Sequence, residues 1–230
     1  LDPDVSGTDK ENNNTGDMAG DYYFPHAALK IQATDHFSVG LIYDQPYGAD
    51  AEYSGDSGFV ENRPVPFKGG TSVVVDTQNL NLLVGYQPND NWNLYAGAVY
   101  QTVDGTVLLR GTTYSVFNGY DFRTGEDESV GWLAGVAYQI PEIALKTSIT
   151  YRSEIDHKAS AHEYGQSNVL AFVGSSPVYD VATDANITTP QSVNLDFQTG
   201  IMANTVAFAN VRWVNWKDFS IDLKQFGTVA

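Results

Sequence analysis

The chain contains no cysteine, and it has no long hydrophobic segment. The first absence excludes a disulfide framework and any thiol chemistry, and it is compatible with an oxidising periplasmic route. Nothing in the sequence approaches 18 consecutive apolar residues, which excludes a transmembrane helix. A strand that crosses a membrane escapes this test, because polar and apolar residues alternate along it. The mean hydropathy of −0.26 therefore averages over polar and apolar residues and does not reveal such strands.

Basic residues are also scarce. Only 12 Lys and Arg stand against 28 Asp and Glu, which gives a formal net charge of −16. A nucleic-acid partner is not expected, because phosphate neutralisation needs clustered Lys and Arg. Most of the acidic residues fall in long polar segments, which are interpreted as solvated loops. Binding of divalent cations that bridge surface glycolipid is the alternative interpretation, and no spacing in the sequence specifies it.

No pattern in the sequence indicates catalysis or a cofactor. The run at 55–58 (GDSG) resembles the nucleophile segment of trypsin-type proteases, but the following Gly and an upstream His motif are missing. His157 and His162 are not spaced as metal ligands on one helix, and no phosphate-binding Gly-x-x-x-x-Gly-Lys run occurs. We therefore predict no enzyme, no metal and no cofactor.

The chain does contain a regular series of strand-like segments with alternating polarity. Eight such runs are predicted, at 22–34, 36–45, 75–87, 92–111, 129–140, 144–160, 191–203 and 206–223. The joins alternate between a few residues and long polar stretches, which lie at 46–74, 112–128 and 161–190. Bacterial outer-membrane barrels have tight turns on the periplasmic side and long loops outside. The alternation predicts an all-β fold, an antiparallel transmembrane β-barrel.

The segment 92–111 shows the two faces that such a barrel needs. Trp92, Leu94, Ala98 and Tyr100 point to one side, with aromatic residues at both ends of an apolar band, and polar or small residues alternate with them. This pattern predicts lipid outside and a wet or plugged lumen inside. The half-solvated sheet of a soluble sandwich gives the same alternation, so a secreted all-β binding module remains an alternative.

Several short runs resemble the FadL family of outer-membrane transporters for long-chain fatty acids and other hydrophobic compounds. The strongest match is 131–138 (GWLAGVAY) followed by 149–154 (ITYRSE). Weaker matches occur in the same order as in the family, at 1–5, 24–26, 36–40 and 211–219. The resemblance implies that residues 1–230 are one partial domain, about eight middle strands of a fourteen-stranded barrel. The N-terminal hatch of the family, with its Asn-Pro-Ala motif, and the closing strands are expected to lie outside this chain.

The resemblance also implies that substrate leaves sideways into the bilayer, through an inward kink in one strand. The matching positions are Asp44, Gln45, Pro46, Tyr47 and Gly48. Pro46 has no N–H for the ladder and Gly48 accepts unusual backbone angles, so both disrupt strand pairing. From the residues alone, an equally good interpretation is that the strand ends here and a long loop begins.

A carboxylate head group in a barrel lumen needs a cation, preferably an arginine with its fork of donors. By the resemblance, Arg110 at the far end of the segment 92–111 matches a basic residue of the family. Four other cations share the predicted lumen face and are alternates: Lys30, Lys146, Arg152 and Arg212. For Arg152, a structural salt bridge with Glu154 or Asp156 is the competing interpretation.

The predicted function is passive uptake of long-chain fatty acids or similar apolar molecules across a bacterial outer membrane. The protein is expected to be a monomer that contacts outer-membrane lipid and lipopolysaccharide. The segment 112–128 is short, whereas the fatty-acid members of the family carry an apolar capture groove there. This departure favours, as an alternative, the relatives that admit monoaromatic hydrocarbons. A non-selective porin is a further alternative.

Overall fold

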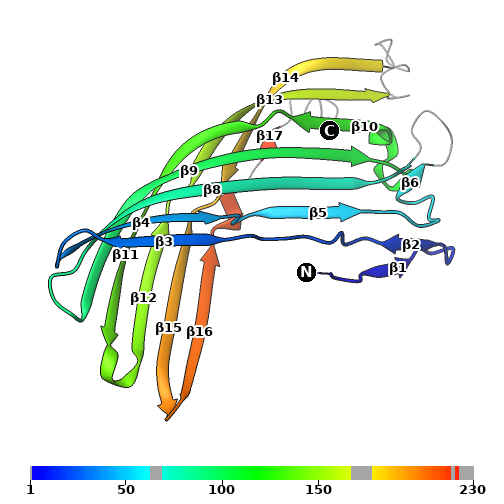
Figure 1. Cartoon of the computed structure of the whole chain (residues 1–230). Helices are drawn as coiled ribbons and strands as arrows, with labels where there is room; N and C mark the ends of the chain where they lie inside the picture. Colours follow the sequence, from blue (N-terminus) through cyan, green and yellow to red (C-terminus); the bar gives the residue numbers. More distant parts are fainter. Residues whose placement is uncertain (1, 63–68, 167–177, 219–220, 223–230) are drawn as a thin grey trace.

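The structure is a computed structural model, and it describes residues 2–62, 69–166, 178–218 and 221–222. One antiparallel sheet dominates it and bends strongly around a concave side (Figure 1). The strands of this sheet are β3 (Ala27–Gln32), β4 (Phe37–Asp44), β5 (Gly48–Glu52), β8 (Ser72–Tyr86), β9 (Trp92–Leu109), β10 (Tyr120–Thr124), β11 (Asp127–Ile140), β12 (Leu145–Arg152), β13 (Ile155–Gln166), β14 (Val178–Thr189), β15 (Ser192–Met202), β16 (Thr205–Val214) and β17 (Ile221–Asp222).

Two small hairpins accompany the sheet. They are β1 (Ser6–Thr8) with β2 (Asn14–Asp17), and β6 (Glu61–Asn62) with β7 (Gly69–Gly70). Three short 3-10 helices are η1 (Thr112–Phe117), η2 (Pro141–Ile143) and η3 (Trp216–Asp218). None of the helices in the described part of the chain is long and apolar enough to span a membrane.

Several strands of the large sheet are two halves of one longer strand, separated by a short break. β8 pairs with both β4 and β5, and β9 pairs with both β10 and β11. β12 and β13 are likewise two halves of one long strand, as are β14 and β15, and β16 and β17. The described residues thus form eight long strands, each antiparallel to the next, which confirms the predicted number. Within them β3 and β16 have one neighbour each, so the sheet is not closed.

The sequence underestimates how far the strands extend. Residues 112–128, predicted as a loop, contain η1, β10 and the start of β11. Residues 161–190, also predicted as a loop, contain most of the hairpin of β13 and β14, and positions 167–177 lie outside the described residues. The outward residues of β13 are Asp156, Lys158, Ser160 and His162. A strand with such residues on its outer face lacks apolar alternation, and its sequence is therefore mistaken for a loop.

Other predicted boundaries move for the same reason or because a strand is broken. The regular strand predicted from residue 22 starts at Ala27, and the one predicted at 144–160 is interrupted at Ser153 and Glu154. The predicted loop 46–74 contains β5 and the start of β8. Parts of the predicted segments lie outside the described residues: 63–68, 219–220 and 223.

The two faces of the strands differ as predicted. On β8 and β11, which flank β9, the outward side chains of Leu82 and Trp132 are 54% and 53% exposed, whereas the inward Asn81 and Gln101 are 0% and 1% exposed. Aromatic pairs mark both ends of the outward apolar band. Trp92–Tyr138 (ring centroids 4.8 Å apart) and Phe37–Tyr86 (5.2 Å) lie near the tight turns, and Trp132–Tyr151 (5.1 Å) lies at the other end. Such a band between two aromatic girdles suits lipid rather than water.

The concave face is packed rather than empty. Val99, Leu133 and Ile155 form one buried cluster, against which Leu83 and Tyr95 pack. A second cluster lies toward the long-loop end and consists of Tyr120, Phe122, Ala161, Ala185 and Ile187. The inner side of the wall is therefore stabilised by its own side chains at two levels.

A charge placed on the apolar band tests where the lipid lies. Leu82→Arg lies between the girdles and is expected to lower the free energy of unfolding by about 2–4 kcal/mol in lipid vesicles, because a charged residue destabilises the lipid face most at the midplane. Thr102→Arg, outward on β9 beyond Tyr100, is the matched control and is expected to change it by about 0–1 kcal/mol. Urea titrations followed by tryptophan fluorescence measure both. Equal effects would contradict the assigned membrane boundary.

Candidate functional site

The strand formed by β4 and β5 is interrupted at the positions that the sequence singles out. Asp44, the last residue of β4, pairs with Asn79, and Gly48, the first of β5, pairs with Asp76. Three residues, 45–47, therefore lie opposite two on β8, which is the count of a β-bulge. The strand does not end here, because β5 resumes on the same partner.

Side-chain hydrogen bonds replace the missing ladder at this bulge. Pro46 has no N–H to donate. The backbone N–H of Tyr47 donates to Thr77 Oγ1 (3.1 Å), and the Thr77 hydroxyl donates to the carbonyl of Tyr47 (2.5 Å). A single threonine on β8 thus satisfies both backbone groups of Tyr47 and fixes the bulge in place.

The wall is unpaired beside this bulge. β3 and β4 pair as far as Ala27 and Tyr43, and the next pairing along the wall is an isolated bridge between Ala19 and Ala51. Between these two points the described structure shows no ladder joining the two stretches of chain. Backbone groups on both sides are therefore free of strand pairing, in a sheet that is otherwise continuous on both flanks of β8 and β9.

A cavity of about 350 Å³ lies along the unpaired stretch. Its lining combines aromatic rings of the N-terminal segment with the bulge itself and includes Tyr22, Tyr23, Phe24, Tyr47 and Gly48. The rings of Tyr22 and Phe24 contact each other, with centroids 4.8 Å apart. Aromatic rings thus line one part of this cavity at the gap in the wall, and Asp21, Asp50 and Asp76 line another part of it.

A second cavity, of about 430 Å³, occupies the concave face toward the tight turns and is called the lower cavity below. Three of the five predicted cations line it together: Lys30, Lys146 and Arg152. Leu83, Tyr95 and Leu133 contribute the apolar part of its lining. The structure therefore assembles cations from β3 and β12 around one space, although they are far apart in the sequence.

Arg152 has a partner that the sequence did not identify. Its Nη2 lies 3.1 Å from Asp44 Oδ2, and its Nη1 donates to Asn81 Oδ1 (3.2 Å). Asn81 in turn donates to Asp44 Oδ1 (2.7 Å). The competing interpretation, a salt bridge to Glu154 or Asp156, is wrong, because the guanidinium instead crosses the concave face to the residue that precedes the bulge.

Arg110 lies apart from this cavity. It follows the last residue of β9 at the long-loop end and is 6% exposed. Its guanidinium contacts Asp121 (2.5 Å) and donates to the carbonyls of Leu109 (3.0 Å) and Tyr120 (3.1 Å). These contacts join β9 to β10.

Arg212, the fifth predicted cation, faces the bulge from β16. It is opposite Asn194 in the β15–β16 ladder, and its guanidinium carbon lies 5.2 Å from the centroid of the Tyr47 ring. The structure therefore brings Arg212 to the bulge and not into the lining of the lower cavity.

A polar network closes the concave face at the level of the bulge. Gln101 donates to Asn79 (2.7 Å) and accepts from the Thr189 hydroxyl (2.6 Å), and its Oε1 lies 3.0 Å from His157 Nε2. His157 Nδ1 is 3.0 Å from Asp127. The cavity left beside these residues is about 10 Å³, barely enough for one water molecule. The sequence marked these side chains as inward and polar, but it carries no signal for their contacts.

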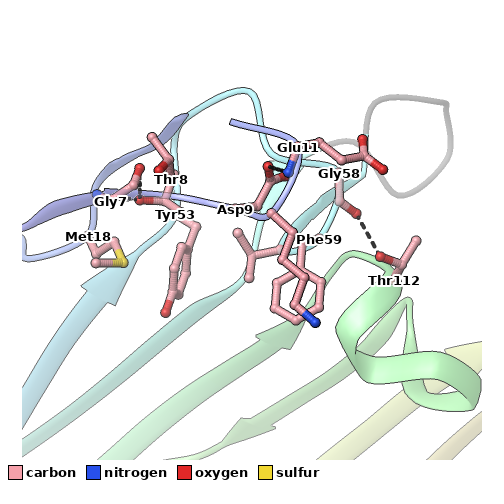
Figure 2. Close-up of a pocket in the computed structure, with 12 residues that line it drawn as sticks. Gly7, Thr8, Asp9, Glu11, Met18, Tyr53, Gly58, Phe59 and Thr112 are labelled. Atoms are coloured by element: carbon pink, nitrogen blue, oxygen red, sulfur yellow. Dashed lines mark hydrogen bonds between the residues drawn. The ribbon is translucent and has the colours of Figure 1, made fainter. Parts of the chain in front are cut away.

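A third cavity, of about 740 Å³, lies at the long-loop end beneath the β1–β2 hairpin. Figure 2 shows Met18, Tyr53 and Phe59 below the hairpin, and Thr112 of η1 donating to the carbonyl of Gly58 (3.4 Å). Asp9 Oδ2 of the hairpin accepts from the Ser57 hydroxyl (2.6 Å), and the backbone N–H groups of residues 55–57 donate to the carbonyls of Asn14 and Thr15. No local pattern in the sequence indicates this cavity, because its walls come from three separate segments.

The chain matches the model of a family described as outer membrane protein transport protein (OMPP1/FadL/TodX) over residues 2–227. A FadL homologue from Pseudomonas aeruginosa is 17% identical, with a TM-score of 0.60, covering 96% of this chain and 55% of that one. The toluene transporter TodX from Pseudomonas putida is 12% identical (TM-score 0.62; 91% and 59% covered), and TbuX from Ralstonia pickettii is 13% identical (0.58; 90% and 59%). The chain thus spans more than half but less than two thirds of these structures. No protein of curated function matches it.

The hairpin over the third cavity is expected to detach in acid. Hydrogen bonds from the Ser57 hydroxyl and from Asn13 lower the pKa of Asp9 to about 2, from an ordinary value of 3.8. Because the folded pKa is the lower one, the carboxylate stabilises the docked hairpin fully above 3.8, and this stabilisation is lost as the pH falls toward 2. Hydrogen exchange of the amides in 5–17, compared between pH 5 and pH 2.5, measures the loss. Asp9→Asn is the control: its exchange in this segment should be fast at both pH values, and a pH response as large as that of the unmodified chain would contradict the assignment.

Proposed function

The chain belongs to the family of outer-membrane transport proteins that includes FadL and TodX, and on this premise we propose that it forms part of the wall and lumen of a passive channel for hydrophobic molecules. The channel lies in the outer membrane of a bacterium and acts as a monomer. Its apolar outer band contacts membrane lipid, and its acidic outer end lies against lipopolysaccharide.

The observation that carries this proposal is the gap in the wall beside the bulge. An alkyl chain is costly to hydrate, at roughly 0.8 kcal/mol per CH₂ group, so a water-filled pore is a poor route for it. The polar network and Arg152 block the straight route through the lumen at the same level. A molecule that arrives from the long-loop end meets this block next to the aromatic cavity at the gap. If the molecule leaves through the wall at Asp44 to Gly48, it enters the bilayer without crossing water and without passing the block in the lumen.

We propose a fatty acid as substrate, because cations beside apolar side chains line the lower cavity, which adjoins the block at Arg152 on the tight-turn side. In this proposal the head group binds there while the tail lies at the gap. Lys30 and Lys146 form no ion pair within the described residues, so a carboxylate head group can bind there. Arg152 is already paired with Asp44 and contributes positive charge at longer range. Arg110 is less suitable, because Asp121 and two carbonyls occupy its guanidinium.

A monoaromatic hydrocarbon is the second candidate. The connection between β9 and β10 consists of little more than η1, and of its residues Thr112 lines the third cavity. A small neutral ring needs neither a long apolar groove nor a cation. Tyr22, Tyr23 and Phe24 at the gap are suitable stacking partners for it.

Bridging the gap tests the proposed route. Because this chain has no cysteine, the variant Phe24→Cys/Gly48→Cys places thiols only on the two sides of the opening, where a Cβ at position 48 would lie 3.7 Å from the Phe24 ring. A cleavable bis-thiosulfonate linker is expected to lower fatty-acid uptake about tenfold in liposomes that contain the full-length protein. Reduction should restore it, and single-cysteine variants treated alike should not respond. Unchanged uptake in the bridged variant would exclude this exit, and uptake no greater than in empty vesicles would overturn the transport function.

The head-group site is tested by comparing an acid with a neutral ligand. Lys30→Gln/Lys146→Gln is expected to weaken fatty-acid binding at least about tenfold, because a hydrogen bond to a charged group contributes roughly 1.5–3 kcal/mol. Toluene binding should not change. Arg110→Gln is the matched variant, expected to spare the preference for the acid. Titrations with a fluorescent fatty acid and toluene competition measure both affinities. A selective loss in Arg110→Gln alone would place the head group at Arg110 instead.

A further inference from the structure

The side chain of Tyr47 reaches across the concave face to the opposite part of the sheet. Its hydroxyl donates to the carbonyl of Pro190 (2.6 Å), a residue 143 positions away in the sequence. Its ring meets the Trp216 ring edge-on, with centroids 5.9 Å apart and planes at 78°. The Arg212 guanidinium lies over the same ring, 5.2 Å from its centroid. Three different contacts therefore converge on one residue of the bulge.

These partners come from breaks in other strands. Pro190 lies between β14 and β15, where its carbonyl is not part of the ladder. Trp216 begins η3, between β16 and β17. Because these strands are interrupted at the level of the bulge, the Pro190 carbonyl and the Trp216 ring lie on the concave side there. Tyr47 occupies the point where the interruptions meet.

We propose that Tyr47 is a latch that holds the bulge in the closed position, and that an acidic ligand releases it by pairing with Arg212. This inference rests on the proposed function, since it concerns the gap through which the substrate leaves. With the latch closed, the bulge stays against Pro190 and Trp216 and blocks the lumen. With the latch open, the segment 45–47 is held to the wall only from β8, through Thr77.

Arg212 gives the latch its chemical selectivity. In the described part of the chain it has no carboxylate within ion-pair distance, and its guanidinium contacts the Tyr47 ring instead. A carboxylate forms a stronger, bidentate contact with a guanidinium than an aromatic ring does. An acid that binds Arg212 better when the ring has left therefore shifts the population toward the open position, and a neutral hydrocarbon does not.

Ion conductance of the full-length protein in planar bilayers tests the latch without any substrate. Tyr47→Ala removes all three contacts and is expected to raise the conductance about tenfold, and Tyr47→Phe, which loses only the bond to Pro190, should give an intermediate rise. Tyr43→Phe is the matched control. It lies four residues earlier in β4 on the outward face and loses a hydroxyl contact to Gln78 (3.1 Å), so its conductance should equal that of the unmodified protein. Resistance to trypsin shows whether each variant is folded. If Tyr47→Ala is not folded, the conductance of Tyr47→Phe decides the test.

The ligand response is measured in the same bilayers. Decanoate is expected to raise the conductance of the unmodified protein about threefold and toluene to leave it unchanged. Arg212→Gln should abolish the response to decanoate. Equal conductance of the Tyr47 variants and the unmodified protein, or an equal response to decanoate and toluene, would overturn the latch.

The two proposals fail differently. If the unmodified protein takes up no hydrophobic molecule into liposomes while Tyr47→Ala still raises the conductance, the transport function fails and the closed position of Tyr47 stands. If uptake is normal and the Tyr47 variants conduct as the unmodified protein does, the latch fails and the transport function stands.

Discussion

A sheet that crosses a membrane must satisfy its backbone N–H and C=O groups within the protein, because the hydrocarbon region has no water to bind them. Two breaks in the wall of the present chain meet this constraint through side chains. At Tyr47 the side chain of Thr77 takes over both backbone groups. At Ser153, where β12 and β13 separate, the hydroxyl accepts from the N–H of Trp132 (3.0 Å), and the N–H of Ser153 donates back to the carbonyl of Trp132 (2.9 Å). Short hydroxyl side chains therefore make the interruptions tolerable.

The same reasoning applies to charge on the concave face. A charge removed from water is destabilising unless it is paired or hydrogen-bonded. Arg152, which lies at the closed level of the lumen, has both a carboxylate and an amide partner. Lys30 and Lys146 line the open lower cavity, where water reaches them, and need no protein partner. These two lysines are therefore unpaired at a place where a ligand can also reach them.

The sequence predicted the number of long strands, their antiparallel order and the outward apolar faces, because each rests on a local period of two. It failed where the outer face becomes polar, as along Asp156, Lys158 and His162 on β13, since lipid no longer requires apolar residues there. It placed Lys30, Lys146 and Arg152 on one face, and all three line the lower cavity. It did not foresee that Asp44 pairs with Arg152 or that Tyr47 contacts Pro190. Those contacts depend on the curvature of the whole sheet, which no local pattern encodes.

One extra residue in a strand has two consequences here that belong together. Residues 45–47 leave the ladder, so the wall loses its pairing to the N-terminal segment and a gap appears beside β5. The same three residues bulge toward the concave face, where Pro46 and Tyr47 lie beside Arg152 and Thr189. The one bulge therefore both interrupts the pairing of the wall and places side chains on the concave face.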